Sequence, residues 1–213
     1  LDIKVQSGIC AIDGIEAKEY DFSTVSQSEI FTLDKNVEQE QKDAILAAKN
    51  KHNSVGGVAL VNVKNAPIGL GEPLYFKLDS QIANAMMSIN AVKAVEIGDG
   101  TLSSKVKGYD NNDQIRKDGF KTNHSGGILG GISNGDDINV KIYFKSTPSI
   151  FIKQETVDIQ NNEVDCALKG RHDPCVAVRG SVVAESMMAL VLADMALLNL
   201  SSKIQNVKKV YSK

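Results

Sequence analysis

The stretch that decides the fold of this chain reads Gly170-Arg171-His172-Asp173-Pro174-Cys175-Val176-Ala177-Val178-Arg179-Gly180. It stands just before the most apolar part of the sequence, residues 182–200, which predicts a long buried helix. Arg171 and Asp173 place a cation and a carboxylate at the entrance of that helix. Charges held there lose hydration energy, which is typical of binding and proton-transfer sites. A simple ion pair between Arg171 and Asp173 is the alternative interpretation.

The segment of residues 182–200 is also almost long enough to cross a bilayer as a helix. Glu185 and Asp194 lie inside this segment, and each carboxylate would be costly at the centre of a membrane. We therefore expect a core helix, in a protein that has no membrane partner.

Composition narrows the class of protein further. A chain of 213 residues can bury one real hydrophobic core. The net charge of −2 and the isoelectric point near 6.0 argue against nucleic acid as a partner, because such proteins carry a basic face. Three cysteines without disulfide-type spacing, and a first segment that does not resemble a secretion signal, predict a reduced, cytoplasmic protein.

Hydrophobic periodicity predicts strands at residues 1–5, 55–63, 92–97 and 138–144 and helices at residues 34–52, 78–89 and 182–200. Asp34 is suited to cap the first of these helices, and Glu38 with Lys42 forms a favourable i,i+4 pair in it. The second helix carries a single buried stripe, formed by Leu78, Ile82, Met86 and Ile89. The polar residues 101–115 predict a long surface loop. This order of elements predicts an α+β fold with helices packed on an antiparallel sheet.

Two loops could carry chemistry. The glycine-rich residues 126–135 match neither a dinucleotide fingerprint nor a Walker A loop, so they predict either close backbone approach to a flat ligand or a tight turn in a sheet. Lys145, Ser146, Thr147 and Ser149 bring an ammonium and three hydroxyls into one loop, which suits a phosphate group. That spacing alone is not specific.

Other candidate residues favour structural roles. Cys166, His172 and Cys175 are too irregularly spaced to predict a zinc site, so we expect no metal. His124 lies in the glycine-rich region, where a single histidine is more often a structural donor. His52 follows a lysine-rich helix end and fits a helix C-terminus.

Five stretches, taken in order, resemble the chorismate synthase family. They are Gly69-Leu70-Gly71-Glu72-Pro73, residues 86–100 (MMSINAVKAVEIGDG), residues 123–135 (NHSGGILGGISNG), residues 145–149 (KSTPS) and residues 170–194 (GRHDPCVAVRGSVVAESMMALVLAD). They occur in the family's order and spacing, and the ordered set is specific although no single stretch is.

The resemblance implies a fold and an assembly. The family builds a β-α-β sandwich, with helices between two antiparallel sheets, and assembles as a homotetramer. Residues 1–213 would be the C-terminal portion of a single domain, roughly its last three-fifths, and would therefore be truncated. The portion outside the chain holds the family's catalytic histidines. We therefore expect the chain alone to be inactive and one face of its last helix to be exposed.

The resemblance also implies a reaction. The family is a lyase of the shikimate pathway, which leads to the aromatic amino acids. It converts 5-enolpyruvylshikimate 3-phosphate to chorismate and phosphate by an anti 1,4-elimination that needs reduced FMN, and some members reduce that flavin with NADPH. A non-catalytic flavin- or phosphate-binding module and a purely structural half-domain are the alternatives.

Site residues follow from matching positions. By resemblance, Asp173 and Arg171 are catalytic, with Asp173 near flavin N5 and Arg171 between flavin and substrate. The residues that resemble the family's flavin-binding positions are Asn90, Ala91, Gly130, Lys145, Ser146, Thr147, Pro148, Ser149 and Arg171. Ser146 departs from the proline that is common in the family at its position.

Overall fold

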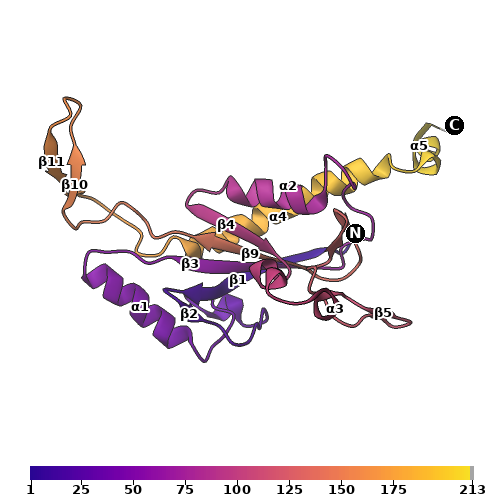
Figure 1. The fold of residues 1–213 in the computed structure, drawn as a ribbon, viewed down its shortest axis with the longest axis horizontal. Helices are drawn as coiled ribbons and strands as arrows, with labels where there is room; N and C mark the ends of the chain where they lie inside the picture. Colours follow the sequence, from indigo (N-terminus) through magenta and orange to yellow (C-terminus); the bar gives the residue numbers. More distant parts are fainter. Residues whose placement is uncertain (212–213) are drawn as a thin grey trace.

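A five-stranded antiparallel sheet organises the computed structural model, which describes residues 1–211 (Figure 1). Its strand order is β2 (Ile15–Glu16), β1 (Lys4–Ile12), β3 (Gly57–Lys64), β9 (Ile138–Phe144) and β4 (Val92–Ile97). Every neighbouring pair of these strands is antiparallel. The predicted α+β class and the predicted strands are confirmed, although β1 begins at Lys4 and runs well beyond the predicted residue 5.

Alternation along β9 decides which face of the sheet is buried. Ile138, Val140 and Ile142 are fully buried on one face, whereas Lys141 and Tyr143 point to the other face and are half-buried. Two helices cover the apolar face, α2 (Leu78–Met87) and α4 (Ala177–Leu200). As predicted, α2 buries Leu78, Ile82 and Met86.

Helix α4 is buried on one face only. Its buried positions, which include Gly180, Ala184, Met188 and Leu192, face β1, β3 and α2. On the opposite face Leu190 is 65% exposed and Leu197 is 66% exposed. The expected core helix is therefore confirmed on one face only, and the expectation that another face is exposed is confirmed as well. By length and composition α4 could cross a membrane, and it is the one such helix found in residues 1–211.

This exposed face predicts self-association of the chain, because an apolar patch of this kind is a docking or aggregation surface. Replacing Leu190 and Leu197 together with lysine is expected to shift the weight-average mass, measured by light scattering, toward the monomer. Leu46→Lys on α1 (Glu38–Asn50) is the control, because Leu46 is 52% exposed but lies on a different helix. A chain that is monomeric before substitution would contradict the prediction.

The start of α1 differs from the prediction. The helix begins at Glu38 after Val37, and the Asp34 carboxylate does not cap it. Asp34 instead accepts hydrogen bonds from the backbone N–H groups of Lys18 and Asn36, both at 2.9 Å, and these bonds lower the pKa of its carboxyl. Because the backbone N–H groups of these two residues bind the Asp34 carboxylate, Asp34 does not act as the predicted N-cap of α1. The Glu38–Lys42 pair is confirmed, with the ammonium 3.0 Å from the carboxylate.

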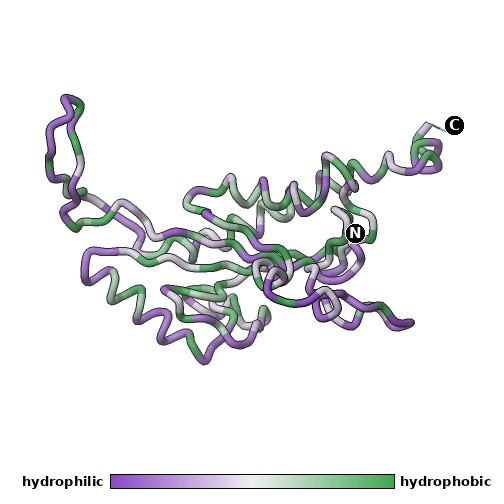
Figure 2. Tube along the Cα trace, viewed as in Figure 1, coloured by the Kyte–Doolittle hydropathy of each residue, from purple (hydrophilic) through white to green (hydrophobic). Residues whose placement is uncertain are grey.

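The remaining elements are short, and they lie in the connections or, in the case of the last helix, near the C-terminus. The predicted loop over residues 101–115 contains single turns, and its following residues form a small hairpin that is mostly hydrophilic (Figure 2). Except for the amphipathic helix α5 (Ile204–Tyr211), none of these pieces is long enough to show periodicity. They are η1 (Val25–Gln27), η2 (Gly100–Ser104), α3 (Gly108–Asn111), β5 (Ile115–Arg116), β6 (Gly119–Phe120), β7 (Ile128–Leu129), β8 (Ile132–Ser133), β10 (Gln154–Val157), β11 (Glu163–Cys166) and α5 (Ile204–Tyr211).

Candidate functional site

Two predicted cofactor segments lie side by side at one end of the sheet. Residues 145–149 follow the last residue of β9, and Asn90 and Ala91 precede β4, which pairs with β9. The Lys145 backbone N–H donates a hydrogen bond of 2.9 Å to the Ala91 carbonyl oxygen. Ala91 has a positive φ of 71°, so the chain turns sharply at this contact. The antiparallel pairing of β4 with β9 therefore brings together residues more than fifty positions apart.

The loop of residues 145–149 has the donors that a phosphate group needs. Lys145, Ser146 and Ser149 are exposed, and no salt bridge involves the Lys145 ammonium among the described residues. The Thr147 hydroxyl oxygen is buried, and within residues 1–211 it has no hydrogen-bond partner. A buried hydroxyl without a partner is costly and is commonly satisfied by a ligand or water. This donor set fits the phosphate of FMN.

Arg171 and Asp173 line a surface groove of about 630 Å³ beside this loop. The Asp173 carboxylate forms an ion pair with the Arg179 guanidinium in the first turn of α4. Arg171 is exposed and takes part in no salt bridge of the described part of the chain. The alternative of an Arg171–Asp173 pair is therefore wrong, because the helix brings Arg179 to the carboxylate instead.

A second groove, of about 480 Å³, lies on the other side of that ion pair. Ser88, Asn90 and Arg179 are its polar members, and its apolar lining is formed by Ile89, Phe144, Val176, Val183 and Met187. A mostly apolar groove with a few polar groups, here one cation, one amide and one hydroxyl, is typical of a small-molecule or cofactor site. Sequence reasoning missed Arg179, and the available signal was a cation six residues after Asp173, just inside the helix.

Gly130 lies away from this cluster. It occupies the exposed turn between β7 and β8 and has a φ of 61°, so this part of the glycine-rich stretch forms a tight turn. The hairpin is fixed to the start of α2, where the Leu78 N–H donates to the Gly131 carbonyl oxygen at 2.8 Å. Asn90 follows the other end of α2, about 15 Å away along a helix of 10 residues. Within one copy of the chain, Gly130 therefore lies far from Asn90.

The other titratable candidates occupy structural positions. The His124 Nδ1 atom is 2.6 Å from the Asp99 carboxylate, as expected for a structural histidine. Burial raises the pKa of the Cys10 thiol to about 12 and also raises the pKa of Cys175, so neither is a thiolate at neutral pH. In residues 1–211, no group of three or more histidine, cysteine or carboxylate side chains could hold a metal ion.

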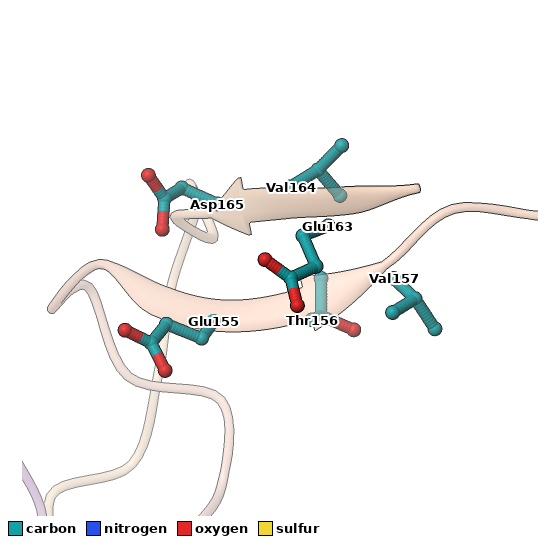
Figure 3. A pocket seen from close by; sticks show the side chains of 6 residues that line it. All are labelled: Glu155, Thr156, Val157, Glu163, Val164 and Asp165. Atoms are coloured by element: carbon teal, nitrogen blue, oxygen red, sulfur yellow. The ribbon is translucent and has the colours of Figure 1, made fainter. Parts of the chain in front are cut away.

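An open surface hollow of about 640 Å³ lies on the β10–β11 hairpin, at a distance from the sheet (Figures 1 and 3). Figure 3 shows the carboxylates of Glu155, Glu163 and Asp165 around it. All residues of both strands are exposed. Three carboxylates would repel a phosphorylated ligand, so the two grooves at the end of the sheet are the better candidate site.

Comparisons with known proteins show the family to which the chain is related. The family model described as chorismate synthase matches residues 1–197. The chain is 81% identical to the chorismate synthase of Aliarcobacter butzleri (strain RM4018) and 60% identical to that of Sulfurimonas denitrificans (strain ATCC 33889 / DSM 1251). Each match covers the whole chain but 60% of the relative, so the chain spans about three-fifths of the length of these relatives.

A solved structure supports the same relationship. The crystal structure of a chorismate synthase superposes on the chain with a TM-score of 0.77 and 30% sequence identity. The match covers 98% of this chain and 61% of that one. The agreement therefore extends over both sequence and fold, and the chain belongs to the chorismate synthase family.

Proposed function

We propose that this chain provides the flavin-binding side of a lyase that converts 5-enolpyruvylshikimate 3-phosphate to chorismate and phosphate. The observation that supports this proposal is the meeting of residues 145–149 with Ala91, beside the two grooves that flank Asp173 and Arg179. In an anti 1,4-elimination one C–O bond and one C–H bond break and one C=C bond forms, with no net oxidation or reduction. The protein must therefore neutralise a departing phosphate and accept a proton.

Each named residue then has a distinct task. Lys145 and the hydroxyls of residues 146–149 hold the phosphate of FMN, and the groove beside Asn90 accepts the ring. Reduced FMN, when bound, supplies electron density for breaking the C–O bond. Arg171 provides positive charge at the junction of cofactor and substrate. The Asp173 carboxylate, oriented by Arg179, takes part in proton transfer at its oxygen atoms.

The same proposal also covers the oligomeric state and the cellular location. We propose a cytoplasmic homotetramer that uses reduced FMN, with NADPH as one source of reducing equivalents. Because Gly130 lies at the far end of α2, its contact with the flavin would require a second copy of the chain.

Replacing Lys145 with alanine is expected to weaken FMN binding by about tenfold or more, because a charged hydrogen bond to phosphate is lost. Flavin fluorescence during a titration measures the dissociation constant. Lys64→Ala is the matched control. Lys64 is also an exposed lysine, but it lies at the end of β3 that is far from residues 145–149. Equal dissociation constants for the two variants would contradict the assignment of the phosphate site.

Turnover distinguishes the proposed lyase from the two alternatives. We expect no chorismate from the chain alone, and turnover when it is mixed with the part of the A. butzleri relative that it does not span. Binding of FMN without turnover in the mixture would favour a non-catalytic module. Absence of both would leave a structural half-domain.

A further inference from the structure

Residues 52–55, between α1 and β3, contact both loops of the proposed site. On one side, the Ser54 hydroxyl donates a hydrogen bond of 2.6 Å to the Thr147 carbonyl oxygen, and the Phe151 N–H donates to the His52 carbonyl oxygen at 3.1 Å. These bonds fix residues 145–151, the loop of the phosphate site. A connection between two elements therefore provides the support for a loop almost a hundred residues later in the chain.

The same four residues hold the loop that carries Arg171 and Asp173. The Val55 N–H donates to the Pro174 carbonyl oxygen at 2.8 Å. The His172 Nε2 atom lies 3.2 Å from the Asn53 carbonyl oxygen. Because His172 and Pro174 flank Asp173, these two bonds hold the backbone on both sides of Asp173.

Ring packing joins the two loops directly. The Phe151 and His172 rings lie edge to face, with centroids 4.6 Å apart and an interplanar angle of 61°. The His52 ring also lies near the Phe151 ring, with the two ring centroids 6.1 Å apart. Edge-to-face rings at this separation attract each other. Phe151 therefore links residues 145–151 to the Arg171–Asp173 loop through His172.

We propose that Ser54 is a positioning residue that sets the phosphate loop at a fixed distance from Arg171 and Asp173. Ser54 is not among the residues that line either groove, so it acts through the Thr147 backbone. The Thr147 hydroxyl, buried and without a partner among residues 1–211, belongs to the residue that Ser54 holds. This inference rests on the proposed function, because that function requires both loops to contact one cofactor.

Amide hydrogen exchange of the 213-residue chain tests the structural part of this inference. In Ser54→Ala, exchange is expected to rise about fivefold at the Phe151 amide, which bonds to the His52 carbonyl oxygen, and at the Val55 amide, which bonds to the Pro174 carbonyl oxygen. Fivefold is the factor that corresponds to one ordinary hydrogen bond, and the two amides report on the two loops. Ser54→Thr keeps a hydroxyl and is expected to restore slow exchange. Ser104→Ala is the matched control, because the Ser104 hydroxyl bonds to the Thr101 carbonyl oxygen at 2.8 Å in η2. Faster exchange confined to one loop, or in neither, would overturn the proposal.

FMN titration tests the functional part. The dissociation constant for FMN is expected to rise about fivefold in Ser54→Ala and to return in Ser54→Thr. An unchanged dissociation constant, with both loops exchanging faster, would also overturn the positioning role. If the unsubstituted chain binds no FMN, then cofactor binding by this chain fails as a proposal, whereas the exchange result still decides whether Ser54 couples the two loops.

Discussion

Replacing Asp173 with asparagine is expected to lower the rate of chorismate formation by about 10²-fold or more, because a carboxylate that assists proton transfer contributes at least that factor. The assay uses the chain mixed with the part of the A. butzleri relative that it does not span, with reduced FMN and the substrate in excess. The substitution keeps the shape of the side chain and removes its charge, and with it the ion pair to Arg179.

A matched variant separates the chemical effect from loss of an ion pair. Asp165→Asn removes another partly exposed carboxylate that is paired with a cation, Lys153, on the β10–β11 hairpin. We expect it to leave the rate unchanged. Because a partly exposed pair contributes about 1 kcal/mol or less to stability, both variants should keep nearly the same free energy of unfolding. A similar rate for both variants would remove Asp173 from the catalytic residues.

Replacing Gly98 with alanine is expected to lower the free energy of unfolding by about 3 kcal/mol or more, through strain at a left-handed position and a backbone clash. Gly98 directly follows β4 and has a φ of 60°, and its N–H donates to the Asn139 carbonyl oxygen at 2.9 Å. A methyl group there would overlap the His124 carbonyl oxygen and the Gly126 N–H group. These are backbone atoms, so they cannot turn away as a flexible side chain could. Chemical denaturation measures the change.

Gly108→Ala is the control for this second prediction. Gly108 begins α3, has no atom within 4 Å of an added methyl group and does not have a positive φ. Alanine is favoured over glycine in a helix, so the free energy of unfolding should change by less than about 1 kcal/mol. Equal losses for the two variants would show that the crossing of residues 98 and 124–126 does not constrain the fold.

The strands were predictable because their signal is local. Strict alternation in β9, and the β-rich residues of β3 and β4, follow from the two faces of a pleated strand and need no knowledge of the partners. The stripe of Leu78, Ile82 and Met86 predicted α2 for the same reason. The short pieces between residues 100 and 120 carry no such period, and they were predicted only as a loop.

The candidate site was predictable in part. Motif order identified the family, which the relatives and the solved structure confirm. The spacing of hydroxyls and lysine indicated the phosphate loop, and its role remains a prediction. The pairing of Asp173 with Arg179, and the support of both loops by residues 52–55, could not be predicted from motifs. Both depend on which of several nearby groups reaches a carboxylate or a carbonyl oxygen once the chain is folded.

By itself, the sequence determined the type and place of the main elements, the family, and the residues that could serve a flavin phosphate. The tertiary structure decided which face of α4 is buried, that Gly130 lies apart from Asn90, and that Asp34 supports a loop instead of capping α1. The physical reason is one of range. Periodicity and propensity act over a few residues, whereas burial, ion pairing and hydrogen bonding depend on atoms brought together from distant parts of the chain.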